Sequence, residues 1–413
     1  MAQATIYGRT DIGYGVKASQ MGTGGTGAKQ LGIMDGGNAG SRIGFRGTED
    51  LGGGMKAHFV TEQGISPTNG ALFGVRSGAA GIQYDGYAAA AGNDPGSAGA
   101  YTQGTNRQTY LGLEGGFGTV RVGYQYTTFY EIATLSGFTN TSEGMAGGSI
   151  AHLWGQAVAG GTRANMINYI SPKLAGAWTV GLQMGSAGGR ENTEFVGVTN
   201  TANGRALDKQ ARTSLHIDYN HGPLRAAFGY TTFESNLGAA LANNTTGGAG
   251  LTGVTAAGGV NTFSVLGALT NFAATAGTAN VAVQTNMTQL AGTYNFGAIK
   301  LGATINSGQS TSNSTNTTTL VVTPTVTNIS SRAVSAVMPM GKLDIVGGFN
   351  NASLDVGGTP NADWASSQLG LKYNFSKRTV MYGYTGTSTN NLATAATAVK
   401  VMTGTLIGID HQF

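Results

Sequence analysis

Many segments of about ten residues alternate between an apolar side chain and a polar or small one. Residues 368–375 are the clearest case, with a leucine or an aromatic residue at every second position. Residues 120–126, 178–184 and 224–230 repeat the pattern. Because successive side chains of a strand point to opposite faces, each segment predicts a strand with one apolar and one polar face. Strands that separate lipid from water in a membrane barrel have this form.

The last segment, residues 403–413, alternates in the same way and ends on the aromatic Phe413. Unpaired backbone groups along an exposed edge strand invite aggregation. We therefore expect this segment to pair with the first one, residues 4–16, so that the sheet closes on itself. The prediction is an all-β fold in which residues 1–413 form a single transmembrane antiparallel β-barrel domain.

The connections alternate between short and long. Short ones carry Gly, Pro or Asx residues suited to tight reversals, and they lie at 49–54, 115–118, 171–176, 221–223, 296–297, 339–342 and 376–378. Long polar ones span roughly 17–40, 65–104, 127–162, 186–210, 235–286, 308–328, 352–364 and 389–400. These connections join sixteen strands and place both termini on the short-turn side. Short periplasmic turns and long extracellular loops are the arrangement of outer-membrane barrels.

Two of the long connections, 235–286 and 308–328, are rich in Thr, Asn, Ala and Gly and carry no charged residue. We expect both to be long, neutral outer loops. The apolar run 263–269 inside the first leaves open an additional pair of strands between 261 and 286.

The composition also bears on the class of protein. Only 10% of the residues are charged, 40% are hydrophobic and 70 are glycine, yet no stretch approaches the roughly 18 apolar residues of a membrane-spanning helix. Apolar content spread thinly by alternation is typical of a transmembrane barrel. A Gly/Thr/Asn-rich surface fibre or a disordered repeat is the other interpretation, but it would not explain aromatic residues at strand spacing.

Cysteine is absent, which excludes disulfides and thiolate metal sites and fits a protein that crosses an oxidising periplasm. Residues 1–4, Met-Ala-Gln-Ala, are consistent with a mature start behind an added initiator Met, since signal cleavage follows small residues. The net charge of +4 is spread along the chain, so no basic cluster indicates a nucleic-acid partner.

The strand phase also predicts which charged side chains face the lumen. If Ile43 and Phe45 face lipid, Arg42 and Arg46 face water, and a Lys or Arg on the lipid side near the midplane would cost roughly 2–4 kcal/mol. The same phase turns further side chains inward: the basic Lys56, Arg121, Arg225, Lys300 and Lys372, and the acidic Glu62, Asp218 and Asp344. An excess of cationic groups in a narrow pore selects anions. Paired wall residues that only support the barrel are the alternative for each of them.

Catalytic and metal sites find little support. The histidines are His58, His152, His216, His221 and His411. His216 and Asp218 share a strand face, so a barrel hydrolase is conceivable, but no nucleophile motif accompanies them. We expect a protein that is not an enzyme and that needs neither a metal nor another cofactor.

Several segments resemble the trimeric general porins of Gram-negative outer membranes, especially their β-proteobacterial branch. The matching residues are 41–57 (SRIGFRGTEDLGGGMKA), 106–113 (NRQTYLGL), 117–123 (FGTVRVG), 371–379 (LKYNFSKRT) and 408–413 (GIDHQF). The resemblance covers the strands of the first third and the end, and is poor from about 235 to 330. It implies a homotrimer in the outer membrane and makes Phe413 the signal that the barrel-assembly machinery reads.

The resemblance also implies that the third long loop, 127–162, folds into the lumen and narrows it. That loop carries Glu131 and Glu143, and it lacks the family's Pro-Glu-Phe-Gly motif. Opposite the loop, these porins carry a ladder of arginines. Arg42 and Arg107 stand at the matching motif positions, so the resemblance implies this role for them. Arg163 is a third candidate, although strict alternation turns it outward unless the strand starts after it.

The predicted function is therefore an outer-membrane porin through which small hydrophilic solutes and ions diffuse passively, with a mild anion preference. Its expected partners are membrane lipid, copies of itself, the assembly machinery and the solutes. A substrate-selective channel and a surface-binding, adhesive barrel with a plugged lumen are the alternatives.

Overall fold

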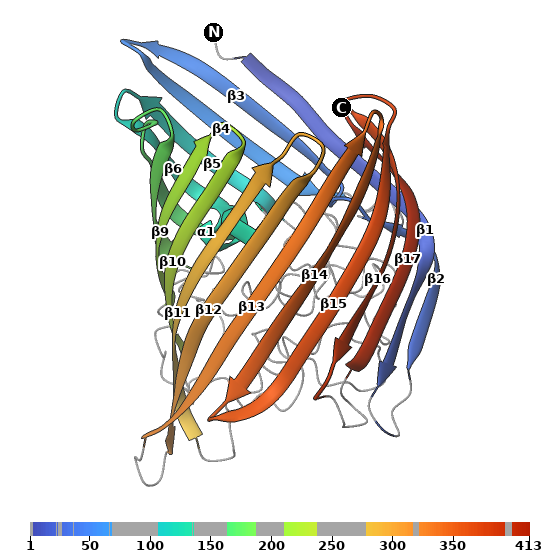
Figure 1. Ribbon diagram of the computed structural model, residues 1–413. Coiled ribbons are helices and arrows are strands. Elements are labelled where there is room, and N and C mark those ends of the chain that lie inside the picture. The colour runs from blue at the N-terminus through green and yellow to red at the C-terminus, as the bar shows by residue number, and fades with distance from the viewer. Residues whose placement is uncertain are drawn as a thin grey trace, which may run out of the picture.

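The structure, a computed structural model, describes residues 3–21, 27–35, 37–65, 106–133, 163–186, 210–237, 278–316, 322–392 and 399–413, with the single residues 23, 67 and 135. These residues form seventeen strands and one short helix (Figure 1). In chain order they are β1 (Gln3–Met21), β2 (Ala28–Asp35), β3 (Arg42–Gly52), β4 (Met55–Gly64), β5 (Asn106–Gly115), β6 (Gly118–Tyr126), α1 (Thr128–Ala133), β7 (Arg163–Ile170), β8 (Trp178–Ser186), β9 (Gln210–His221), β10 (Leu224–Leu237), β11 (Thr278–Asn295), β12 (Lys300–Asn316), β13 (Val322–Met340), β14 (Leu343–Val356), β15 (Thr359–Asn374), β16 (Thr379–Asn390) and β17 (Val399–Gln412).

The strands pair antiparallel into one closed sheet. β1 pairs with β17 from Arg9 opposite Gln412 to Met21 opposite Val399, as expected for the two ends of the chain. β2 and β3 both pair with β1, β2 along residues 12–19 and β3 along residues 3–9, so they share one place in the wall. The seventeen strands therefore fill sixteen positions, and the predicted sixteen-stranded antiparallel barrel is confirmed.

All the predicted short turns are present, and they lie at the end of the barrel where both termini lie (Figure 1). The turn between β3 and β4 shows why its sequence reverses tightly. Gly52, Gly53 and Gly54 have φ angles of 80°, 59° and 79°, a left-handed region that glycine adopts without the steric penalty of a Cβ.

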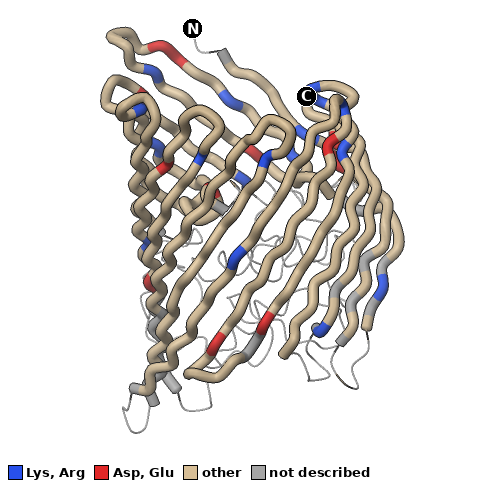
Figure 2. The backbone as a smooth tube through the Cα atoms, in the orientation of Figure 1, with Lys and Arg blue, Asp and Glu red and all other residues tan. Residues whose placement is uncertain are grey.

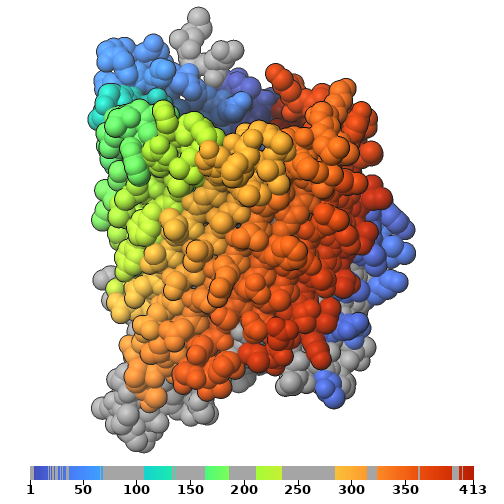
Figure 3. All heavy atoms as spheres, in the orientation of Figure 1, coloured from blue at the N-terminus to red at the C-terminus, as the bar shows by residue number. Residues whose placement is uncertain are grey.

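The two faces of the wall have opposite character. On β15 the side chain of Leu369 is 57% exposed, whereas its neighbour Gln368 is 4% exposed. Figure 3 shows the outer surface of β10–β17 as a continuous wall, and Figure 2 shows that charged residues are sparse along these strands. An apolar outside and a polar inside are the arrangement of a wall between lipid and water. Among the described residues, no helix is long and apolar enough to cross a membrane.

Three predicted long connections are wrong in extent. The predicted loop 17–40 is largely strand, since β1 continues to Met21 and β2 begins at Ala28. The predicted neutral loop 308–328 is also largely strand, because β12 ends at Asn316 and β13 begins at Val322. Residues 352–364 belong to β14 and β15 apart from a two-residue turn.

The extension of β12 carries polar or small side chains on both faces, so the alternation that predicts a strand is absent there. Outside β12 the exposed residues change from Ile305 to Ser307 and Gln309. The strands continue because polar side chains on neighbouring strands form hydrogen bonds with each other. The pairs are Thr285 with Ser310 at 3.0 Å, Gln309 with Asn328 at 3.1 Å and Ser330 with Ser353 at 2.7 Å.

The other neutral loop, 235–286, is delimited by β10, which ends at Leu237, and β11, which begins at Thr278. β11 therefore occupies the last part of the segment in which extra strands were left open. Residues 238–277, including the apolar run 263–269, lie outside the described residues.

Candidate functional site

Glu62 of β4 brings together two of the predicted arginines. Its Oε1 accepts a 2.6 Å hydrogen bond from Nε of Arg107, and its Oε2 lies 3.4 Å from Nε of Arg42. Oε2 also accepts a 3.1 Å hydrogen bond from the Tyr7 hydroxyl. Glu62 is only 5% exposed, while Phe59 on the opposite face of β4 is 36% exposed, so this group of side chains lies on the inner face.

Arg107 reaches Glu62 because the pairing of β4 with β5 is irregular. Glu62 is opposite Gln108, but the next residue, Gln63, is opposite Asn106, so Arg107 has no opposite residue. A bulge of this kind re-aims a side chain. Without it, Arg107 would share the outward face of Leu111, which is 63% exposed.

Tyr126, the last residue of β6, connects Arg107 to Arg163. Its hydroxyl accepts hydrogen bonds from Nη2 of Arg107 at 2.8 Å and from Nη2 of Arg163 at 3.1 Å. The guanidinium carbon of Arg163 also lies 4.6 Å from the centre of the Tyr126 ring. Arg163 therefore joins the other two, and strict alternation does not hold at the first residue of β7. We call Arg42, Glu62, Arg107, Tyr126 and Arg163 the arginine row.

The chain leaves β6 and turns at once into α1, inside the barrel (Figure 1). Oγ1 of Thr127 accepts a 3.3 Å hydrogen bond from the Tyr130 backbone, as an N-cap residue does. Gln183 of β8 fixes this turn to the wall. Its Oε1 accepts a 2.8 Å hydrogen bond from the Thr128 backbone, and its Nε2 donates a 3.2 Å one to the Tyr126 carbonyl.

Small residues on the wall make room for α1. Ile132 is fully buried in a cluster with Leu135, Ala227 of β10 and Ala291 of β11. A Cβ on Gly229 would overlap with Cδ1 of Ile132. Nothing else in the sequence explains a glycine at position 229, because a larger side chain would serve equally well on the inner wall. The rest of the predicted constriction loop 127–162, including Glu143, lies outside the described residues.

Glu131 of α1 belongs to a second charged group. Its Oε2 lies 3.9 Å from Nδ1 of His216, and Nε2 of His216 lies 3.9 Å from Oδ2 of Asp218. Asp218 accepts hydrogen bonds of 3.2 and 2.9 Å from Arg225. Burial raises the pKa of Glu131 to about 7, against the opposing effect of the positive charges of Arg121 and Arg225.

The remaining predicted lumen residues are dispersed. Two arginines lie over aromatic rings, with Arg46 5.0 Å from the Tyr7 centre and Arg121 5.2 Å from the Tyr110 centre. The others are placed by strand register: Lys56 opposite Asp50 and Glu114, Lys300 opposite Asn295 and Val337, and Lys372 opposite Asp344 and Tyr382. Asp344 accepts a 2.9 Å hydrogen bond from Nδ2 of Asn374.

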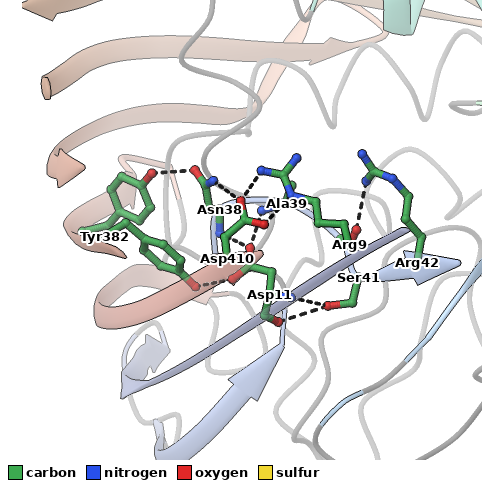
Figure 4. Close-up of polar contacts among 10 residues, drawn as sticks. Arg9, Asp11, Asn38, Ala39, Ser41, Arg42, Tyr382 and Asp410 are labelled. Atoms are coloured by element: carbon green, nitrogen blue, oxygen red, sulfur yellow. Dashed lines mark hydrogen bonds and ion pairs between the residues drawn. The ribbon is translucent and has the colours of Figure 1, made fainter. Parts of the chain in front are cut away.

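Sequence reasoning missed a buried polar group at the barrel seam, which we call the closure cluster: Arg9, Asp11, Asn38, Ser41, Tyr382, Tyr384 and Asp410 (Figure 4). The chain between β2 and β3 bends so that Asn38 reaches the last strand. Nδ2 of Asn38 donates a 2.6 Å hydrogen bond to Asp410, and the Asn38 backbone donates one of 2.7 Å to Asp11. Gly37 permits this approach, because a Cβ there would overlap Leu406 and Tyr382.

No group of three or more His, Asp or Glu side chains in the described part of the chain is arranged to hold a metal ion. The site is thus a row of cationic side chains on the inner wall of a barrel whose outside is apolar. An apolar outer face and charged side chains on the inner face are typical of β-barrels of the outer membrane.

Comparison with known proteins agrees with this class. A family profile described as "Gram-negative porin" matches residues 1–323 and 270–393, and the chain belongs to that family. It is 29% identical over 204 residues to the major outer membrane protein P.IB of Neisseria meningitidis serogroup B, and 27% identical over 215 residues to outer membrane porin protein 32 of Delftia acidovorans. These alignments cover 47% and 51% of this chain and 48% and 50% of the relatives, so the chain spans about half the length of the curated relatives it matches.

Solved structures resemble the whole barrel. A structure described as an anion-selective porin from Comamonas acidovorans matches with a TM-score of 0.63 at 21% identity, covering 100% of both chains. OmpT of Vibrio cholerae lacking loop L8 matches with a TM-score of 0.58 at 13% identity, covering 100% of this chain and 99% of the other. At these identities the likeness concerns the fold. With the family, it identifies the protein as a Gram-negative outer-membrane β-barrel.

Proposed function

We propose that the protein is a passive diffusion channel for small hydrophilic solutes and ions, with a preference for anions. The arginine row carries the proposal, because among the described residues it sets three guanidinium groups against one carboxylate, that of Glu62. An unbalanced set of cationic groups in a narrow pore favours anions through its field. The likeness to a barrel described as an anion-selective porin supports the same direction.

The loop 127–162 is proposed to set the size limit, with Glu131 and Glu143 on its luminal surface. The position of α1 supports this, because Gln183 and the small residues Ala227 and Gly229 hold the start of the loop against the inner wall. A segment fixed there narrows the free cross-section of the barrel.

Arg46, Lys56, Arg121, Arg225, Lys300 and Lys372, with the acidic Asp218 and Asp344, are proposed to line the water-filled path on either side of the row. Their effects on selectivity are proposed to be unequal. Arg225 is paired with Asp218, so its field is largely neutralised, while Arg46 lies over an aromatic ring and keeps its positive charge.

Assembly into a homotrimer and insertion by the barrel-assembly machinery through Phe413 are part of the proposal. Four outward apolar side chains support a subunit contact at β1 and β2: Ile6 (61% exposed), Tyr14 (58%), Leu31 (63%) and Ile33 (58%). Phe413 exchanges two backbone hydrogen bonds with Gly8, of 3.0 and 3.1 Å, so the last residue completes the seam. Chemical cross-linking of the folded protein in mild detergent tests the trimer.

Planar-bilayer recordings test the channel. Arg42→Ser and Arg107→Ser should each move the reversal potential in a KCl gradient toward that of a non-selective pore. Arg332→Ser is the matched control, because Arg332 is exposed and lies opposite Ile305 on the outward face. Unchanged reversal potentials in both row variants would refute the role of the row. A protein without measurable single-channel conductance would instead be a plugged barrel.

A further inference from the structure

Arg212 is a buried charge for which neither the prediction nor the arginine row accounts. It lies on β9, in the same phase as His216 and Asp218, and its side chain is 2% exposed. Its three guanidinium nitrogens, Nε, Nη1 and Nη2, are all buried and make no hydrogen bond to the residues that the structure describes. None of the ion pairs among the described residues includes Arg212.

The residues around Arg212 do not neutralise it. Directly across the strands it faces Phe233 on β10 and Gly185 on β8. The guanidinium carbon is 6.0 Å from the centre of the Phe233 ring, which is the outer limit of a cation–π contact. Tyr124 of β6 is within electrostatic reach, but it is a phenol that carries no charge at neutral pH. The nearest hydroxyls along the strands, Ser214 and Thr231, bond to each other at 3.0 Å.

A guanidinium group does not lose its proton in a protein, so Arg212 stays charged although it is buried. Burying a charge is strongly unfavourable unless the charge is paired and hydrogen-bonded. A buried cation with five unused N–H donors therefore requires an acceptor that the described part of the chain does not supply. Guanidinium nitrogens bind carboxylates in a planar, two-point geometry and bind a halide through converging N–H groups.

We propose that Arg212 holds a small anion, a halide or a carboxylate, at a fixed site in the inner wall beside Phe233. Arg212 is not a member of the arginine row. It differs from the row in kind, because Arg42, Arg107 and Arg163 already bond to Glu62, to Tyr126 or to the backbone, whereas Arg212 has all its donors available. The bound anion supplies the missing charge partner and stabilises the packing of β9 against β8 and β10.

Crystals of the detergent-solubilised protein grown with bromide as the only halide test the site directly. The proposal predicts an anomalous difference peak in contact with the Arg212 guanidinium in the parent protein, and none there in Arg212→Met. A second crystallisation with acetate as the only small anion separates the two anion classes, since planar density across two nitrogens marks a carboxylate site. Absence of density at Arg212 in both conditions would overturn the proposal.

Thermal unfolding in detergent gives an independent readout. At constant ionic strength, the parent protein should unfold at a higher temperature as chloride replaces a bulky anion that cannot enter the wall, and Arg212→Met should lose this dependence. Arg332→Met, which removes an outward arginine, should keep it. If Arg212→Met is instead more stable than the parent at every chloride concentration, the guanidinium is uncompensated and the proposal fails. Neither readout depends on ion selectivity, so this inference and the proposed function can fail separately.

Discussion

Nε of Arg107 donates a 2.6 Å hydrogen bond to Oε1 of Glu62, and this contact sets the charge of the arginine row. Glu62 contacts Arg42 through its other oxygen, so one carboxylate partly neutralises two arginines. Arg163 contacts the row through the Tyr126 hydroxyl. Among the described residues, the row therefore holds more guanidinium groups than carboxylates.

Glu62→Gln should strengthen the anion preference. It removes the negative charge of the row while the amide can still accept a hydrogen bond from Arg107. One unit charge about 4 Å away is worth about 1 kcal/mol even in bulk water, so the permeability ratio should change about five-fold in favour of the anion. Reversal potentials in a KCl gradient measure this, with Glu234→Gln on the exposed outward face as the control. A shift toward cation preference would contradict the charge assignment of the row.

Tyr382→Phe should destabilise the barrel more than Tyr384→Phe. The Tyr382 hydroxyl donates a 2.5 Å hydrogen bond to the buried carboxylate of Asp11, whereas the Tyr384 hydroxyl donates a 2.8 Å one to the neutral amide of Asn38. Hydrogen bonds to charged groups contribute roughly 1.5–3 kcal/mol and neutral ones about 1 kcal/mol. Urea unfolding in detergent compares the two, which lie two residues apart on one strand. Equal losses would show that the closure cluster does not depend on the Asp11 charge.

Gly229→Val should displace α1 from the wall, because the new side chain occupies the space of Ile132. Overpacking of this kind costs about 1–3 kcal/mol, and single-channel conductance should change with it because α1 lies in the lumen. The double variant Gly229→Val with Ile132→Ala should recover the parent values. Gly383→Ala is the control, since the nearest atom to its new Cβ is 3.8 Å away. An unaltered conductance in Gly229→Val would separate α1 from the pore.

The anion preference should fall as pH rises through about 7. Glu131 has a pKa raised to about 7, so it is neutral below that pH and adds a negative charge above it. The charged or titratable neighbours of Glu131 are His216, whose Nδ1 lies 3.9 Å away, and beyond it Asp218, Arg121 and Arg225. Glu131→Gln should remove the step in reversal potential between pH 6 and 8. If Glu131→Gln kept the full change in reversal potential, that change would come from another titrating group.

The same group links pH to stability. The folded pKa of Glu131 lies above its ordinary value of 4.5, so the folded protein binds the proton more tightly than the unfolded chain does. Stability from this group is therefore greatest below about 4.5 and is lost as pH rises to about 7. Unfolding temperatures of Glu131→Gln should lack this decline, which the parent protein should show over the same range.

The alternation of residues 368–375 and the closing end at Phe413 were sufficient to predict the barrel, because lipid outside and water inside impose a period of two. The prediction failed where this contrast ends, at Ser307 and beyond, since strands with polar residues on both faces have no such period. The strand phase alone predicts that Arg42 faces the lumen. It does not predict this for Arg107 and Arg163, because a bulge redirects Arg107 and Arg163 is the first residue of its strand.

Other parts of the site depend on contacts between distant segments. Gln183 and Gly229 acquire their roles only when α1 lies against them, and Asn38 only when the last strand is beside it. A single buried arginine such as Arg212 resembles every other inward arginine in the sequence. Only the unused donors of its side chain distinguish it.

The reversal potential of the unmodified protein in a planar bilayer, with KCl concentrated on one side, tests the central claim most directly. The account predicts discrete conductance steps and a potential of the sign set by chloride permeating faster than potassium. A potential of the opposite sign, through steps of clear conductance, would contradict it.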